Sequence, residues 1–358
     1  MSRSRTGSAT AARRRAHEVR GRSQDAAAAD LLTLAADREM ARAKPKSKAA
    51  PARTPAKRSQ GPSVLRGNPL LRDAIDTIDG TVMSLVQRGR EGSLDDRDPE
   101  FIERQVALLE PLVDLYFRGE VRHLERMPAT GPVLAVGNHS GGLLTPDTWV
   151  FQVKYIRHFG TDRLTYALAH NMVLGMPVIG DMLRRNGTLP AHPDYARAAL
   201  RKGAAVLVYP GGDEDVFRPW RERNRIRLAR RTGFIRLALQ ERVPLVPVVS
   251  VGGHETVFIA GDGRGLARLL GLDRFRLKAL PLVIGPPWGV SPGDLLFHLP
   301  LPAKITVDVG EPIDFRAQFG DLDARDPEVL WACYEFVERR MQSMLDDLAA
   351  ERRLPVLG

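Results

Sequence analysis

His139 is the residue of this sequence best suited to acid–base chemistry, because it lies in a short polar segment directly after the apolar run Val133–Gly137. A carboxylate follows eight residues later, at Asp147. An imidazole oriented by a carboxylate can act as a general base and deprotonate an alcohol. The same pair also fits a hydrogen-bonded loop histidine and a carboxylate at a helix start, which Thr145 would cap and Pro146 would open. The surrounding segments therefore have to decide between these interpretations.

Three further segments that can bind or polarise a substrate follow in order. The first is Gly180–Arg185 (GDMLRR), and the second is Tyr209–Asp215 (YPGGDED). The third is the apolar run Val243–Val249 (VPLVPVV), which leads into GGHE at residues 252–255. The paired glycines Gly211 and Gly212 allow backbone N–H groups to approach a ligand or an oxyanion.

Together with the His139 segment, these three segments resemble the glycerolipid acyltransferase family. That family contains bacterial lysophosphatidate acyltransferases and a diacylglycerol acyltransferase-like branch, and the resemblance covers about residues 115–345. It implies that His139 takes the proton of an acceptor hydroxyl, which then attacks the thioester of acyl-CoA or of an acyl carrier protein. It also implies a lipid acceptor and no bound cofactor, since the acyl donor is a co-substrate.

The chain departs from the pattern of this family in two places. In the family, four residues usually separate the His from the Asp, but position 144 is Leu here, so Asp147 is the candidate orienter of His139. The segment of the family that corresponds to Tyr209–Asp215 commonly reads Glu-Gly-Thr-Arg, with the Arg holding a phosphate. Here Pro-Gly-Gly is followed by three carboxylates, at residues 213–215. Carboxylates repel a phosphate, and the Pro-Gly-Gly form resembles the branch that acylates neutral alcohols such as mono- or diacylglycerol.

An acceptor that carries a phosphate stays an alternative, because Arg184, Arg185 and Arg218 could bind it and Arg suits a bidentate phosphate contact. The same arginines would equally form surface salt bridges to the acidic block. The candidate substrate-binding residues are Asn138, Ser140, Gly141, Gly142, Arg184, Arg185, Pro210, Gly211, Gly212 and Arg218. No metal site is expected, because the histidines lack ligand spacing and the single cysteine, Cys333, excludes a Cys-based site.

Two other functions fit the same segments. Residues 138–142 differ by one residue from Gly-x-Ser-x-Gly, the elbow that exposes the nucleophilic serine of an α/β-hydrolase. In that case Ser140 would act with Asp213 or Asp215 and then His254 or His298. This hydrolase ranks second, because Asn138 replaces the elbow glycine and His139 would have no role. The other alternative is a catalytically silent membrane-binding protein, which the unusual spacing of His and Asp favours.

Strand-like runs alternate with helical patterns along the chain. This alternation predicts an α/β fold, in which a mostly parallel central sheet carries helices on both faces and positions the segments named above. Strands are expected at Val121–Leu124, Val133–Gly137, Leu164–Ala169, Ala204–Tyr209, Val243–Val251 and Lys304–Val309. Helices are expected at Pro69–Arg88, Asp98–Phe117, Met172–Leu183, Pro193–Lys202, Thr232–Gln240 and from Asp326 to about Arg352, besides the helix that Thr145 opens.

The charge of the chain is concentrated near its N-terminus. Of the formal net charge of +10, residues 1–60 carry 15 Lys and Arg against 5 Asp and Glu, and residues 61–358 are formally neutral. We expect residues 1–65 to form a disordered basic tail and residues 66–358 to form the acyltransferase domain. A neutral domain argues against a specific nucleic-acid partner, whereas the tail suits a tether to anionic lipid at about 1 kcal/mol per basic residue.

A peripheral cytoplasmic location, on the inner face of the plasma membrane, is expected from three features. The chain opens without a signal-peptide core, contains one cysteine, and has no apolar run of the roughly 18 to 20 residues that span a bilayer. The region Gly263–Pro302 is the best candidate for membrane contact, because Leu and Phe alternate with Arg and Lys before an apolar loop rich in Pro and Gly. The oligomeric state is left open.

Overall fold

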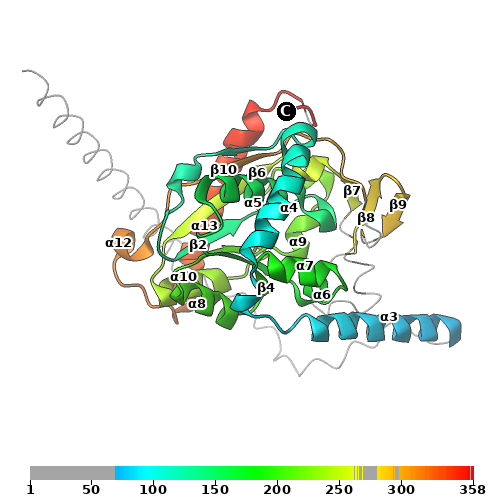
Figure 1. The fold of residues 1–358 in the computed structure, drawn as a ribbon, viewed down its shortest axis with the longest axis horizontal. Helices are drawn as coiled ribbons and strands as arrows, with labels where there is room; N and C mark the ends of the chain where they lie inside the picture. Colours follow the sequence, from blue (N-terminus) through cyan, green and yellow to red (C-terminus); the bar gives the residue numbers. More distant parts are fainter. Residues whose placement is uncertain are drawn as a thin grey trace, which may run out of the picture.

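The computed structural model describes residues 69–261, 263, 265, 268, 280–292, 294, 298–354 and 356–358. The expected tail, residues 1–65, and most of the basic and apolar segment at 264–278 lie outside the described residues. The main body is a seven-stranded sheet with helices packed on it (Figure 1).

The order of the strands in this sheet is β1-β10-β6-β2-β5-β3-β4, and the predicted mostly parallel sheet is confirmed. Their bounds are β1 Glu120–Arg122, β2 Val133–Gly137, β3 Thr165–Ala169, β4 Thr188–Pro190, β5 Ala205–Val208, β6 Leu245–Val251 and β10 Thr306–Val309. Strands β6, β2, β5, β3 and β4 are mutually parallel, whereas β10 pairs antiparallel to β6 and parallel to β1. The short strand β4 was not predicted, because three residues give no recognisable period.

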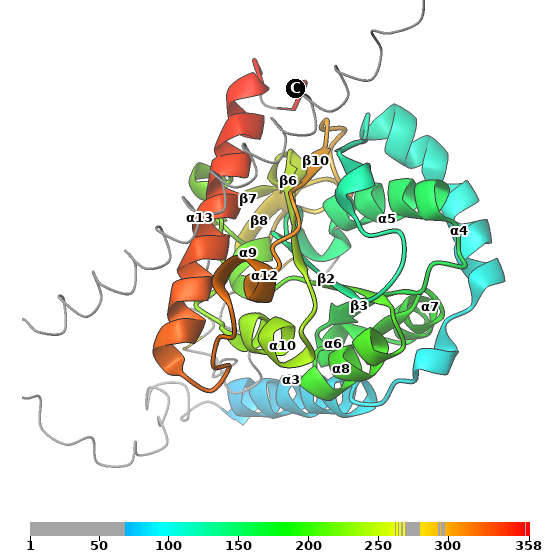
Figure 2. The same cartoon turned by 90° about the vertical axis from the view of Figure 1, so that its left-hand side faces the viewer.

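The central strands are buried on both faces, which is why their sequences read as continuous apolar runs. In β2, Leu134 and Val136 belong to one hydrophobic cluster, while Val133 and Ala135 belong to the other. The first cluster is covered by α8 Pro193–Arg201, α10 Gly233–Glu241 and α13 Pro327–Glu351, and the second by α4 Pro99–Pro111 and α5 Pro146–Phe159. Figure 2 shows α13 on one side of the sheet and α4 and α5 on the other, so the prediction of helices on both faces is confirmed.

Most predicted helices are present, with three differences. Helix α3, Pro69–Arg88, matches its expected bounds, whereas the helix expected at Asp98–Phe117 changes to a π-helix, Leu112–Tyr116, after α4. The helix expected at Met172–Leu183 is two helices, α6 Asn171–Leu174 and α7 Ile179–Arg185, because Pro177 between them cannot continue a helical hydrogen-bond ladder. Thr145 is not the predicted cap: it has φ 44° and its side chain makes no capping bond.

A second, antiparallel sheet of three strands was not predicted. It consists of β7 Phe258–Gly261, β8 Leu282–Gly285 and β9 Gly289–Pro292. Strands β8 and β9 lie where the sequence indicated an apolar loop. The Pro and Gly residues that suggested a loop lie in the turn between β8 and β9, at residues 286–289. The small sheet packs one face on a third hydrophobic cluster, which contains Val216, Phe217 and Val257.

Candidate active site

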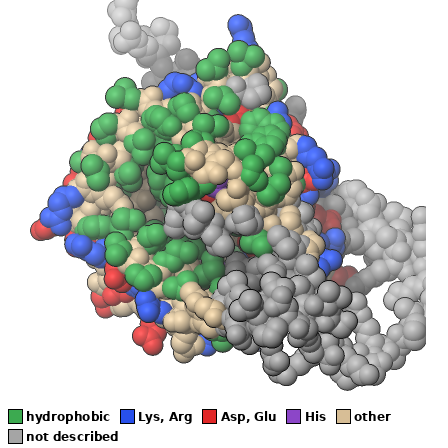
Figure 3. Space-filling model, turned by 90° about the vertical axis from the view of Figure 1, so that its right-hand side faces the viewer, with side chains coloured by type: hydrophobic (Ala, Val, Ile, Leu, Met, Phe, Trp, Pro, Cys, Tyr) green, Lys and Arg blue, Asp and Glu red, His purple; other side chains and the backbone are tan. Residues whose placement is uncertain are grey.

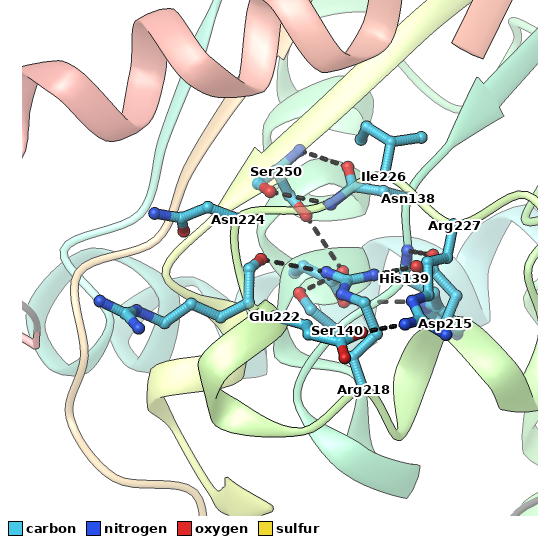
Figure 4. A network of polar contacts seen from close by, with 12 residues as sticks. Asn138, His139, Ser140, Asp215, Arg218, Glu222, Asn224, Ile226, Arg227 and Ser250 are labelled. Carbon is cyan, nitrogen blue, oxygen red and sulfur yellow. Dashed lines mark hydrogen bonds and ion pairs between the residues drawn. The ribbon is translucent and has the colours of Figure 1, made fainter. Parts of the chain in front are cut away.

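The segments that carry the candidate site residues meet at one edge of the main sheet, because they lie at the carboxyl ends of three adjacent parallel strands. His139 follows β2, Tyr209 follows β5, and Ser250 lies at the end of β6. In parallel α/β sheets this edge is where ligands bind. The sequence order of the segments therefore becomes a spatial cluster (Figure 4).

Asn138 fixes the end of β2 to the end of β6. Its amide nitrogen donates to the Ser250 carbonyl at 2.9 Å, and its amide oxygen accepts from the Ser250 N–H at 2.7 Å. Both groups are buried, so this side chain replaces a pair of ladder bonds where the strands diverge. Asn138 was predicted to bind substrate, but its amide is engaged within the protein.

Asp147 lies beneath the imidazole of His139. Its Oδ1 is 3.8 Å from His139 Nδ1, within ion-pair range but beyond hydrogen-bond distance. The carboxylate is 2% exposed and accepts from Ser140 Oγ at 2.9 Å, Ser250 Oγ at 3.2 Å and the Thr148 N–H at 2.8 Å. A ring shift of about 1 Å would close the His139–Asp147 bond, and catalytic hydrogen bonds are often this loose without substrate.

Positive backbone angles explain how eight residues can separate the two groups. Gly141 has φ 90° and Gly142 has φ 70°, values that glycine adopts without strain, and Thr145 adds a third left-handed residue. The chain therefore turns back before α5 begins and brings the Asp147 carboxylate under His139. Gly141 and Gly142 were predicted to contact substrate, and in the structure they shape this turn.

Tyr209 holds the imidazole from the opposite side. The Tyr209 ring is stacked on the His139 ring, with centroids 4.0 Å apart and planes 14° apart. Its hydroxyl accepts from Thr148 Oγ1 at 3.0 Å, and burial raises the pKa of Tyr209, which keeps the phenol neutral. A Cβ at Gly137 would lie 2.5 Å from the Tyr209 ring, so glycine is needed there. Sequence reasoning missed this contact, because an aromatic at the end of an apolar run reads as core.

Asp215 and Arg218 form a buried ion pair next to His139. Asp215 is 0% exposed and Arg218 is 1% exposed. Arg218 donates to one carboxylate oxygen of Asp215, and the backbone N–H of His139 donates to the other (Figure 4). Burial lowers the pKa of Arg218 to about 9, so the guanidinium still carries its charge at neutral pH. Arg218 is thus a structural cation and not the exposed phosphate ligand that the sequence suggested.

The acidic block after Gly212 is largely neutralised by arginines. Asp213 is 3.3 Å from Arg231, and Asp215 is paired with Arg218. Arg231 also donates to the Pro210 carbonyl at 2.9 Å. These pairs offset much of the negative charge of the block, and the expected repulsion of a phosphate stays a prediction.

A backbone hydrogen bond closes the Pro210–Gly212 turn. The Gly212 N–H donates to the Tyr209 carbonyl at 3.1 Å, so this donor is not available to an oxyanion in this conformation. A Cβ at Gly211 would lie 2.1 Å from the Arg227 carbonyl oxygen, which explains glycine at that position.

Arg184 and Arg185 contact the segment before α4 and the first turn of α4, and not the loop of His139. Arg185 pairs with Asp98 at 2.6 Å. Arg184 donates to the carbonyls of Glu91 and Arg88, both at 3.3 Å. Their predicted role in substrate binding has no support in these contacts.

The serine-hydrolase arrangement is not assembled among the described residues. Ser140 is 2% exposed and donates to Asp147, with no hydrogen bond to a described histidine. His298 is bonded to Asp294 at 2.7 Å, and Asp215 is bonded to Arg218. The described part of the chain also contains no cluster of His, Cys, Asp and Glu that fits a metal ion.

His254 is an unusual neighbour of the site. It is 3% exposed, and neither ring nitrogen has a hydrogen-bond partner in the described structure. Burial, and then the positive charge of Arg218, lowers the pKa of His254 well below 6.5, so the ring is neutral in the folded protein. It lines a narrow polar pocket together with Ser140, Ser250 and Arg223.

We expect the free energy of unfolding to fall when the pH is lowered from 7.5 to 5.5. Below about pH 6.5 the unfolded chain binds a proton at His254 that the folded protein does not bind, so stability is lost at up to about 1.4 kcal/mol per pH unit. Urea denaturation at several pH values measures this slope. His254→Gln should flatten it, whereas His158→Gln, at an exposed site on α5, should not. An unchanged slope in His254→Gln would contradict the assignment.

Comparison with known proteins supports the assignment of a family. A family model described as Acyltransferase matches residues 118–251. An uncharacterized protein of Mycobacterium tuberculosis (Rv0502) is 32% identical over 260 residues, which cover 72% of this chain and 69% of that protein. Diacylglycerol O-acyltransferase 2 of Xenopus laevis is 30% identical over 150 residues, 38% of this chain and 39% of that protein. The crystal structure of the 1-acyl-sn-glycerophosphate acyltransferase PlsC from Thermotoga maritima covers 72% of this chain and 80% of its own, with 15% identity and a TM-score of 0.42.

Proposed function

Because the chain belongs to the acyltransferase family, we propose that it transfers a fatty acyl group from a thioester to the hydroxyl of a glycerolipid-type acceptor, with His139 as the general base. The observation that carries this proposal is the His139 imidazole, held between the buried Asp147 carboxylate and the Tyr209 ring at the ligand-binding edge of the sheet.

The proposed reaction follows from this geometry. His139 takes the proton of the acceptor hydroxyl, and the hydroxyl oxygen attacks the thioester carbonyl. Asp147 stabilises the imidazolium that forms. When the tetrahedral intermediate breaks down, the C–S bond breaks and the imidazolium returns its proton to the leaving thiolate. The products are an ester and a free thiol, and the histidine is ready for another cycle.

The donor is acyl-CoA or an acyl carrier protein, and we propose a neutral alcohol as the acceptor. Arg184 and Arg185 are engaged with residues 88–98, away from His139. Arg218 lies next to His139, but it is buried and paired with Asp215, so its charge is already compensated within the protein. The similarity to diacylglycerol O-acyltransferase 2 supports the same choice.

Thiol release from a long-chain acyl-CoA, measured with an acceptor panel, tests this proposal. The panel contains monoacylglycerol, diacylglycerol, lysophosphatidate and a blank without acceptor. We expect the neutral acceptors to accelerate thiol release and lysophosphatidate to be the poorer substrate. Release that is fastest with lysophosphatidate would refute the neutral-acceptor proposal, and no acceptor dependence would refute acyl transfer from this donor.

Ser140→Ala separates the transferase from the serine hydrolase. We expect this variant to keep acyl transfer within about tenfold of the wild type, since it loses one hydrogen bond to Asp147 and no nucleophile. A fluorophosphonate should not label the wild-type protein. Complete loss of turnover in Ser140→Ala, together with labelling of Ser140, would instead establish the hydrolase.

We also propose that the enzyme acts at a membrane surface. Among the residues that the structure describes, no helix is long and apolar enough to span a bilayer. The basic residues 1–65 stay a predicted tether to anionic lipid on the inner face of the plasma membrane.

A further inference from the structure

The outer face of the small sheet presents a continuous apolar surface. Phe258 on β7 lies opposite Ile284 on β8, which lies opposite Val290 on β9, so these side chains form one row across three strands. They are 41%, 37% and 60% exposed. Leu282, two residues from Ile284 and thus on the same face, is 46% exposed, and Trp288 in the β8–β9 turn is 54% exposed. We call these five residues the β7–β9 face.

The opposite side of the same sheet is already packed. Ile259, Val283 and Ser291 point inward and are at most 4% exposed. The two sides therefore alternate as in a sheet with one buried face, but here both sides are apolar. None of the three strands contains a charged residue. Apolar patches of this kind on a protein surface mark sites of interaction with a membrane or a partner.

The small sheet is joined directly to the loop of His139. The Asp294 carboxylate, just after β9, accepts from the Leu143 N–H at 2.7 Å. Leu143 itself packs on the buried side of the sheet. Figure 3 views the molecule from the side on which Figure 1 places β7, β8 and β9. There, hydrophobic side chains gather around a hollow in which a histidine is visible. The apolar surface and the catalytic loop therefore belong to one part of the molecule.

Basic side chains lie next to this surface. The Trp220 ring contacts the Phe258 ring, with centroids 5.6 Å apart. Arg221, the next residue, has a side chain that is 81% exposed, and the Arg223 guanidinium lies 4.9 Å from the centroid of the Trp220 ring. An apolar face with a tryptophan at a turn and arginines at its edge matches the depth profile of a bilayer, from acyl chains through the interface to anionic headgroups.

We propose that the β7–β9 face inserts into one leaflet of a lipid bilayer and sets the His139 site at its surface. This proposal rests on the proposed function, in which His139 acts on a lipid acceptor. Insertion of the face would let that lipid reach His139 without crossing water. The inserted part comprises the outer side chains of β7, β8 and β9 and the Pro286–Trp288 turn, and the arginines after Trp220 contact headgroups.

Vesicle binding by the full chain tests the proposal. The variant Ile284→Ser/Trp288→Ser is compared with the wild type and with Met83→Ser/Leu108→Ser, which removes hydrophobic side chains that are 48% and 77% exposed on α3 and α4. Sedimentation with phosphatidylcholine vesicles that contain phosphatidylglycerol is measured at 0.5 M salt, which screens the basic tail to a Debye length of about 4 Å. We expect the β7–β9 variant to lose at least about tenfold in partitioning and the control to match the wild type.

Two further readouts keep the proposal falsifiable. Thiol release with a water-soluble short-chain monoacylglycerol, without vesicles, should be equal in all three proteins, whereas no turnover in any of them would refute the proposed function and leave the binding result intact. Vesicle binding that is the same in all three proteins would overturn the insertion. Equal binding together with conversion of a wild-type dimer to a monomer in the β7–β9 variant would assign the face to self-association.

Discussion

His139→Gln is expected to reduce kcat/KM for acyl transfer by about 10³-fold, within the range that general-base catalysis contributes. Glutamine approximates the size of the imidazole and can still hydrogen-bond the acceptor hydroxyl, but it cannot take its proton. Stability should change by less than about 1 kcal/mol, because His139 Nδ1 has no hydrogen bond to lose in the described structure. Thiol release, with urea denaturation of the same preparation, measures both effects.

The matched control is His158→Gln, which removes an exposed histidine from the end of α5. Its activity should equal that of the wild type. If His139→Gln retains more than about a tenth of the wild-type activity, His139 is not the base, and the serine-based alternative returns.

Asp215→Asn is expected to have the largest effect on stability, a loss of about 3–5 kcal/mol, because it leaves the Arg218 guanidinium buried without a counter-charge. Asparagine can still accept from the His139 N–H, so the loss reports the charge and not the size of the side chain. Asp215 and Arg218 are both at most 1% exposed, which excludes rescue by solvent. Urea denaturation of the purified variant measures the free energy of unfolding.

Two comparisons make this prediction specific. Asp181→Asn removes an exposed carboxylate that pairs with Arg184 at 3.4 Å, and it should cost less than about 1 kcal/mol. Asp215→Leu/Arg218→Met removes both charges and should be more stable than Asp215→Asn. A free energy of unfolding for Asp215→Asn within about 0.5 kcal/mol of the wild type would show that the pair does not hold the loop.

The architecture follows from the sequence because strands that are buried on both faces read as apolar runs. Val133–Gly137 was predicted with its observed bounds, and the parallel arrangement of β2, β5 and β6 places three separate sequence segments at one edge. The small sheet was missed, because its strands have four residues each, and because a long basic and apolar segment separates β7 from β8 while two prolines lie between β8 and β9. Short strands of that kind have no periodicity that distinguishes them from a loop.

The site itself was only partly predictable, because sequence spacing does not report chain reversal. The positive φ angles at Gly141, Gly142 and Thr145 bring Asp147 back to His139, and only the two glycines suggested that possibility. The pairing of Asp215 with Arg218 depends on complete burial, which charged residues rarely show. The charged segment that contains Asp215 and Arg218 is therefore typical of solvated surface by sequence, although these two residues are buried beneath the site.

The most direct test of the central claim is analysis of the acylated product, and not only of the thiol. Wild-type protein and His139→Gln are incubated with a long-chain acyl-CoA and diacylglycerol, and the acyl chain is followed by mass spectrometry. We predict that the wild type forms acylated acceptor in an amount equal to the thiol released and that His139→Gln forms almost none. Free fatty acid in an amount equal to the thiol, or equal ester formation by both proteins, would contradict the account.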